Sequence, residues 1–302
     1  MGCTDTRYLH SCQRISIQFQ RLMIKRILVA LDPDSDSRIA TRYAVQIAQQ
    51  TDARITGLAV VDTKTIEVSA RGGGIGSMYY AEKLRENLTQ ETRDQARRLI
   101  AAFEQHVEGA HVRHIETVEE GVPFERIVED MKYHDLLIVG SDPHFFYGHP
   151  KQRTNTLAGI FHHTVGPTLV VPETHRDTRK VLFATNGENS ASRAIRRFVD
   201  LNPFGQDVSI EVLFVYEKGQ QRDADFHLQL TKDFLVDHGY EAHVASMQDE
   251  QRAKQILSHA REKNVDLIVA GSTTSKGLTG YHMSKTTQQL ADNGQIPVFI
   301  EH

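Results

Sequence analysis

The sequence contains few of the residues and segments that mark secreted or membrane-spanning proteins. Only two cysteines occur, Cys3 and Cys12, and none follows in the rest of the 302 residues. A disulfide framework is therefore excluded, and a reducing, cytoplasmic setting is expected. Apolar runs such as residues 136–139 have the length of a core strand and fall far below the ~20 residues that a membrane span needs. We therefore expect no membrane association.

An excess of basic charge is also lacking. Lys and Arg number 35 against 39 Asp and Glu, which gives a net charge of −4. This balance provides no broad positive surface, so nucleic acid is not expected as a partner. With no Trp, 39% apolar residues and 25% charged residues, the composition is that of an ordinary globular protein, and the length allows two domains.

Motifs for metal binding and covalent catalysis are missing from the sequence. The 16 histidines include close groupings at 111/114 and 162/163, but no His-Glu-x-x-His sequence occurs. A structural metal is therefore not predicted. The Gly-x-Ser-x-Gly nucleophile motif is absent too, which leaves catalysis through a covalent intermediate without support.

The first 22 residues differ from the rest of the chain. They show neither strand alternation nor a helical stripe, and they lack the apolar core of a secretory signal. Met23 stands directly before a strong strand pattern. We expect residues 1–22 to be a disordered extension, or Met23 to be the biological start; an amphipathic targeting leader is the less favoured alternative.

An internal repeat is the most informative feature of the chain. Short apolar strands of the first half recur in the second half in the same order, and three such matches indicate a tandem duplication. The second copy is shorter in its middle. The matching segments are residues 25–32 with 179–186, residues 135–141 with 266–272, and residues 167–171 with 297–300.

Between these anchors, strand-like and helix-like segments alternate in both copies. Near-continuous apolar strands that alternate with helices predict a parallel sheet buried on both faces. Each copy is therefore expected to be a doubly wound α/β domain, with a five-stranded, mostly parallel sheet and helices on both faces. Residues 23–172 are assigned to domain 1, residues 173–178 to a polar linker and residues 179–302 to domain 2. The expected strands are 27–31, 54–61, 111–118, 135–140, 168–171, 179–186, 208–216, 241–247, 266–271 and 297–300.

The last strand of each copy would be an exposed edge if it stayed unpaired. We therefore expect residues 168–171 and 298–300 to pair, so that the two domains form an intramolecular pseudo-dimer. A homodimer of whole chains is a further option. The sequence does not identify protein partners.

Ligands of open α/β sheets bind beyond the carboxyl ends of the strands, and both Asp32 and Gly140 fall there. A helix that begins after such a glycine offers free N–H groups and a positive dipole end to phosphate. An anion or nucleotide site is therefore expected at this edge.

These features resemble the universal stress protein family in its tandem, two-domain form. The resemblance covers residues 23–302 and rests on the strand that ends in Asp32, on the strand ends 58–62 and 213–217, on the paired Gly-Ser turns and on the closing helices. It implies a Rossmann-like fold and a role in the stress response. It also implies binding of ATP or another adenine nucleotide, with Mg²⁺ only as the counter-ion of the nucleotide.

Members of that family that bind ATP carry Gly-x-x-Gly, nine further residues, and then Gly followed by Ser or Thr. Domain 2 keeps this spacing and its first glycine, but Thr274 and Ser284 replace the second and third glycines. Lys285 can neutralise phosphate as a point charge, so domain 2 is the favoured nucleotide site. The candidate residues of domain 2 are Asn186, Val215, Gly271, Thr274, Ser284, Lys285 and Thr286.

Domain 1 departs further from the family motif. Pro143, which lacks an N–H, stands at the position of the second glycine, and Arg153 or Thr154 falls at the third. A glycine-rich segment at residues 71–77 lacks the Lys-Ser/Thr of a P-loop, so a connection between strand and helix is its favoured interpretation. The candidate residues of domain 1 are Asp32, Val60, Gly140, Ser141 and Thr154.

The favoured function is a cytoplasmic binding and regulatory module with degenerate phosphate loops, rather than an enzyme. Two alternatives stay open. The first is a slow ATP hydrolase or adenylyl-handling enzyme, for which Asp32 or Asp34 is the best-placed carboxylate. The second is an interaction scaffold that needs no nucleotide.

Overall fold

The computed structural model describes residues 23–33, 37–69, 78–141, 143, 156–277 and 280–302. The expectations for residues 1–22, for Asp34, for the glycine-rich segment 71–77 and for Arg153 and Thr154 lie outside these residues.

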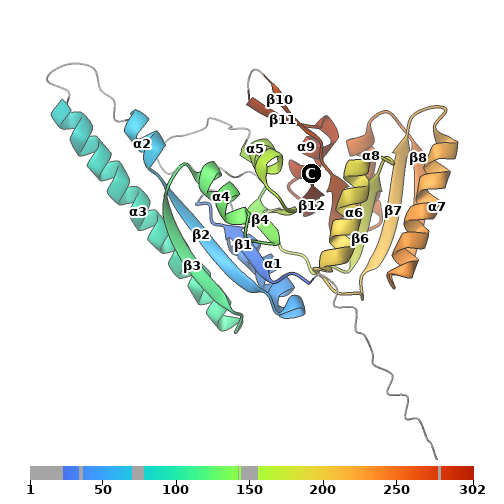
Figure 1. Cartoon of the computed structure of the whole chain (residues 1–302), viewed down its shortest axis with the longest axis horizontal. Coiled ribbons are helices and arrows are strands. Elements are labelled where there is room, and N and C mark those ends of the chain that lie inside the picture. The colour runs from blue at the N-terminus through green and yellow to red at the C-terminus, as the bar shows by residue number, and fades with distance from the viewer. Residues whose placement is uncertain (1–22, 34–36, 70–77, 142, 144–155, 278–279) are drawn as a thin grey trace, which may run out of the picture.

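In the described part of the chain, ten strands form one sheet that runs through the whole molecule (Figure 1). A separate hairpin, β10 (Thr274–Gly277) and β11 (Gly280–Met283), stands above it. The strands of the sheet are β1 (Arg26–Ala30), β2 (Arg54–Asp62), β3 (His114–Gly121), β4 (Leu136–Gly140), β5 (Thr168–Val171), β6 (Lys180–Thr185), β7 (Ser209–Tyr216), β8 (Ala242–Gln248), β9 (Leu267–Gly271) and β12 (Val298–Glu301).

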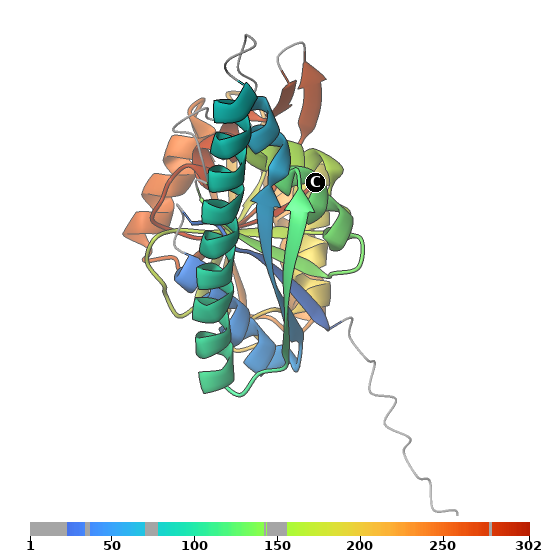
Figure 2. The same ribbon diagram turned by 90° about the vertical axis from the view of Figure 1, so that its left-hand side faces the viewer.

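Helices connect the strands, as the alternating pattern predicts. Figure 2 shows the longest of them, α3, lying along β2 and β3. None of the helices in the described residues is both long enough and apolar enough to span a membrane. The helices are α1 (Ser37–Thr51), α2 (Thr63–Ser69), α3 (Met78–Gly109), α4 (Pro123–Met131), α5 (Thr156–His163), α6 (Asn189–Leu201), α7 (Gln221–Asp237), α8 (Arg252–Glu262) and α9 (Lys285–Ala291).

The strand order is β3-β2-β1-β4-β5-β12-β9-β6-β7-β8, so each half has the same order read outward from the centre. All neighbours pair in parallel except β5 and β12, which are antiparallel, with Val170 opposite Val298 and Thr168 opposite Ile300. The predicted pairing of the last strands is therefore confirmed. It joins the two five-stranded halves into one sheet.

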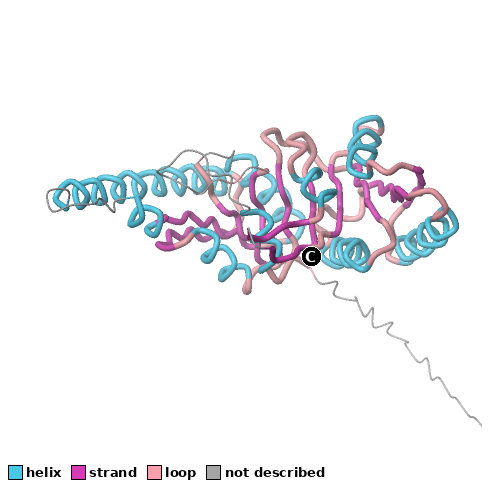
Figure 3. Tube along the Cα trace, turned by 90° about the horizontal axis from the view of Figure 1, so that it is seen from above, coloured by secondary structure: helices cyan, strands magenta, loops and turns pink. Residues whose placement is uncertain are grey.

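Two hydrophobic layers cover the sheet, one on each face, because successive side chains of a strand point to opposite sides. Figure 3 shows helices on both sides of the strands. One layer packs α1, α3, α6 and α7 on the sheet, and the other packs α4, α5, α8 and α9. Both layers contain buried residues from both halves.

The duplication extends to a hydrogen-bonding detail at the start of each half. The Asp135 carboxylate accepts hydrogen bonds from the backbone N–H groups of Lys25 and Arg26, at 2.8 and 2.9 Å. In the second half, Asp266 accepts them from Arg179 and Lys180, at 3.0 and 2.9 Å. Each carboxylate thus fixes the first strand of its half to the fourth.

The structure differs from the expected elements at three places. Residues 63–69 form the short helix α2, which the sequence did not indicate, and residues 274–277 pair with 280–283 as a hairpin, in the segment that aligns with the phosphate loop. The strand expected at 111–118 begins only at His114, because α3 continues to Gly109 and His111 adopts a φ of 55° in the turn that follows. In the predicted linker, the Arg176 N–H donates a hydrogen bond to the Tyr43 hydroxyl at 3.0 Å, which ties this segment to α1 of the first half.

Candidate functional site

A cavity of about 230 Å³ lies at the carboxyl ends of β6, β7 and β9 in the second half. It has an apolar part, to which Val215, Ile256 and Ala270 contribute, and a polar rim. Five of the seven residues predicted for domain 2 line it: Asn186, Val215, Gly271, Ser284 and Thr286.

Gly271 is needed here for close packing. A Cβ at this position would lie 2.2 Å from the backbone carbonyl carbon of Ser190 and 2.4 Å from the backbone nitrogen of Ala191. Only glycine therefore lets α6 begin this near to the end of β9. The contact sets one wall of the cavity.

Asn186 shapes the turn that follows β6. Its Oδ1 accepts a hydrogen bond from the Glu188 N–H at 3.1 Å, and the Thr185 hydroxyl accepts one from the Gly187 N–H at 3.2 Å. Gly187 has a φ of 77°, which a glycine adopts without strain. The Oδ1 atom of Asn186 is therefore engaged in the turn, and the Nδ2 amino group of the same side chain is the part that could contact a ligand.

The hydroxyls on the α9 side are tied to the backbone. Ser284 is the N-cap of α9, and its Oγ accepts a hydrogen bond from the Thr287 N–H at 3.2 Å. The Thr287 hydroxyl in turn donates to the carbonyl oxygen of Gly271 at 3.1 Å. These bonds fix α9 to the end of β9 and keep the cavity open between them.

Two predicted residues, Thr274 and Lys285, lie outside the lining. Thr274 begins the hairpin, and its Oγ1 lies 2.8 Å from Nδ1 of His162 on α5, in the other half. Lys285 is the first residue of α9 and is exposed. The segment that aligns with the phosphate loop instead pairs with itself: residues 274–277 lie antiparallel to residues 280–283.

Arg252, at the first position of α8, is a lining residue that the sequence did not indicate. Its Nη2 lies 3.1 Å from Oε1 of Glu217, and its Nε is buried without a hydrogen-bond partner among the described residues. A single basic residue at a helix start is common, so no signal distinguished it. It brings a cation next to the apolar part of the cavity.

Three residues predicted for domain 1, Asp32, Val60 and Gly140, lie at or near the carboxyl ends of the neighbouring strands β1, β2 and β4. Val60 and Gly140 are buried near the ends of β2 and β4, Ser141 follows β4 directly, and Thr154 lies outside the described residues. Asp32 is fully buried, and its backbone N–H and carbonyl both bond the Ser37 hydroxyl, at 2.8 and 2.7 Å.

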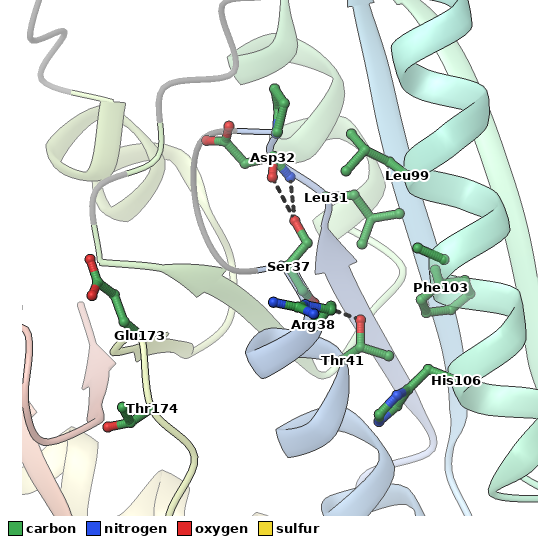
Figure 4. Close-up of a pocket in the computed structure, with 12 residues that line it drawn as sticks. Leu31, Asp32, Ser37, Arg38, Thr41, Leu99, Phe103, His106, Glu173 and Thr174 are labelled. Carbon is green, nitrogen blue, oxygen red and sulfur yellow. Dashed lines mark hydrogen bonds between the residues drawn. The ribbon is translucent and has the colours of Figure 1, made fainter.

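Asp32 lines a different cavity, of about 520 Å³, between α1 and α3 (Figure 4). This cavity lies on the opposite face of the sheet from the cavity of the second half, since its apolar residues belong to the other hydrophobic layer. Among the described residues, no group of three or more His, Cys, Asp or Glu is placed to hold a metal ion.

A family model described as "Universal stress protein family" matches residues 23–172 and 177–301. A universal stress protein from Synechocystis sp. is 22% identical over 288 residues, which cover 91% of this chain and 99% of the relative. The crystal structure of a universal stress protein from Archaeoglobus fulgidus superposes with a TM-score of 0.66 and 16% identity, covering 93% of this chain and 97% of that chain. A family protein from Arabidopsis thaliana, solved with AMP bound, covers 41% of this chain and 90% of its own, with 18% identity and a TM-score of 0.33.

Proposed function

The chain belongs to the universal stress protein family, and from that premise we propose that it is a cytoplasmic binding and regulatory module that takes up an adenine nucleotide in the cavity of its second half. The observation that carries the proposal is the placement of this cavity. It lies beyond the carboxyl ends of parallel strands, where doubly wound sheets bind ligands, and it gathers Asn186, Val215 and Gly271 with Ser284 and Thr286.

The chemistry of the lining favours a nucleoside monophosphate over a triphosphate. Val215, Ile256 and Ala270 offer an apolar slot for a flat base, beside the guanidinium of Arg252. At about 230 Å³, the cavity is smaller than the ~300–1,000 Å³ of typical small-molecule sites. A triphosphate would extend over the rim, where the hairpin stands in place of a glycine-rich loop.

Catalysis has less support than binding. Hydrolysis of ATP needs phosphates held with a metal and a base that positions water. Glu188 is the carboxylate that lines this cavity in the described residues, and it caps the start of α6 without a side-chain bond to the helix. We therefore place the protein among binding modules, with a nucleotide-independent scaffold as the alternative.

Calorimetric titration of the full chain with AMP and with Mg²⁺-ATP tests the proposal. Val215→Phe fills the apolar slot and is expected to weaken AMP binding about tenfold or more, a loss of about 1.4 kcal/mol, because the added ring takes the space of the base. Val60→Phe is the matched control, since Val60 is equally buried at the corresponding position of domain 1. Loss of binding in Val60→Phe alone would place the site in domain 1, and no binding by the unmutated chain would favour the scaffold. Phosphate release above background would favour the hydrolase.

A further inference from the structure

Two residues that line the cavity of the second half stand at the two ends of the hairpin β10–β11. Thr273 comes just before β10, and Ser284 comes just after β11. The Ser284 N–H donates a hydrogen bond to the carbonyl oxygen of Thr273 at 3.0 Å, which closes the base of the hairpin at the rim of the cavity. The placement of the hairpin therefore sets the placement of both rim residues.

The hairpin itself rests on the first half of the molecule. Both of its strands contact α5, beside which it stands in Figure 1. Met283, at the end of β11, packs on the hydrophobic layer that contains Leu157, Ile160 and Phe161 of α5. The cavity is thus lined by the second half, but its rim is supported by a helix of the first.

A polar contact at Thr274 makes this support specific. Thr274 Oγ1 lies 2.8 Å from Nδ1 of His162 on α5 and 3.3 Å from Nε2 of His302, which follows β12. The two imidazole rings are 6.1 Å apart between their centroids. One hydroxyl, a single residue beyond the cavity rim, therefore joins the hairpin to α5.

Given the proposed nucleotide site, on which the inference rests, we infer that α5 of the first half positions the rim of that site, with His162 and Thr274 as the positioning residues. A ligand that contacts Thr273 or Ser284 binds most tightly when the rim is already in place, since an ordered site loses less entropy on binding. Coupling between two sites is reciprocal. A nucleotide bound in the second half therefore also holds α5 of the first half more firmly.

Calorimetric titration of the full chain with AMP tests the two side chains. His162→Phe keeps a ring of similar size but removes the nitrogen that faces Thr274, and it should weaken AMP binding about two- to tenfold, the range of one net hydrogen bond. Thr274→Val should give a similar loss, whereas Thr274→Ser keeps the hydroxyl and should retain the affinity of the unmutated chain. His163→Phe is the matched control: this exposed residue is next to His162 on α5, and its substitution should leave the affinity unchanged.

The double variant His162→Phe/Thr274→Val separates one shared contact from two independent effects. It should bind AMP no more weakly than the weaker of the two single variants, because both substitutions remove the same contact. Additive losses, or equal losses in His162→Phe and His163→Phe, would overturn the inference.

Hydrogen exchange followed by mass spectrometry gives a readout that a purely structural contact would not move. Saturating AMP should slow exchange in α5 of the unmutated chain and have little effect there in Thr274→Val. Helix α1 packs on the opposite face of the sheet and should not respond in either protein. Binding of AMP without any effect on α5 would overturn this inference alone, whereas no binding by the unmutated chain would overturn it together with the proposed function.

Discussion

Glu301 is an unusual charge for its surroundings. It lies on β12, is 9% exposed, and its Oε2 has no hydrogen-bond partner among the described residues. The nearest cation is Arg197, whose Nε is 3.7 Å from that oxygen. Burial raises the pKa of Glu301 from 4.5 to about 7, although Arg197 and Arg193 oppose the shift. The carboxyl group is therefore partly protonated near neutral pH.

This pKa predicts how stability depends on pH. The folded state binds the proton more tightly than the unfolded state, so the contribution of Glu301 is complete below pH 4.5 and is lost as the pH rises through about 7. Glu301→Gln should remove this decline and stabilise the protein at pH 8 by about 1–3 kcal/mol. Urea unfolding at pH 5, 6.5 and 8 measures the free energy of unfolding of both proteins and so tests this expectation. The exposed Glu262→Gln is the control, and a parallel pH profile in both variants would contradict the prediction.

Asp135 and Asp266 support a second prediction at the scale of the residue. Each carboxylate accepts two backbone hydrogen bonds at the start of its half. Asp135→Ala and Asp266→Ala should each lower the free energy of unfolding by about 1–2 kcal/mol. Each substitution removes two charge-assisted hydrogen bonds that lie near solvent. Because the two sites share no partner, the double variant should show the sum. Chemical denaturation of the three variants measures this, and a double loss far from the sum would show that the sites are coupled.

At the scale of the element, the hairpin β10–β11 replaces the phosphate loop of the family motif. It leaves the cavity of the second half at Thr273, returns to it at Ser284, and packs on α5 of the first half. Thr274 Oγ1 bonds His162 and lies 3.3 Å from Nε2 of His302. The segment therefore serves the junction between the halves.

Thr274→Val tests that role because it removes the hydroxyl and keeps a residue suited to a strand. We expect a loss of about 0.5–1.5 kcal/mol in the free energy of unfolding, the net contribution of one hydrogen bond. Ser275→Ala removes a neighbouring exposed hydroxyl of the same strand and should change little. Equal effects of the two substitutions would show that the bond to His162 does not support the junction.

The elements divide into those that local pattern could predict and those that it could not. Apolar runs such as 136–139 and 267–270 predicted the central strands. The strands 168–171 and 298–300 would each have left an exposed edge, and this predicted that they pair. The hairpin was missed because its residues, such as Thr274 and Lys276, carry no strand pattern and gain their structure from packing on α5. Arg252 lines the cavity of the second half, and Gly57 leaves room for the Phe103 ring beside β2. Both roles depend on contacts between distant segments, which no local pattern contains.

At the scale of the whole molecule, the two halves share one sheet and both hydrophobic layers. Phe299 on β12 shows this sharing: it faces Leu169 of β5 in the register of the junction and packs edge-on against Phe198 of α6, at 5.5 Å between ring centroids. Phe198 contacts Phe183 of β6 at 5.3 Å. A change at the junction is therefore transmitted by direct packing to the second half and by strand pairing to the first.

We accordingly expect the molecule to unfold as one unit, with a single thermal transition. Phe299→Ala should cost about 3–5 kcal/mol, because it leaves a cavity where the ring was fully buried. Hydrogen exchange followed by mass spectrometry should then show faster exchange in β1 and in β6 alike, since global opening exposes both. Phe226→Ala deletes the same side chain from an exposed position of α7 and should alter neither strand. Retained protection of β1 together with loss in β6 would mean that the halves open separately, and that the junction of β5 and β12 couples them only weakly.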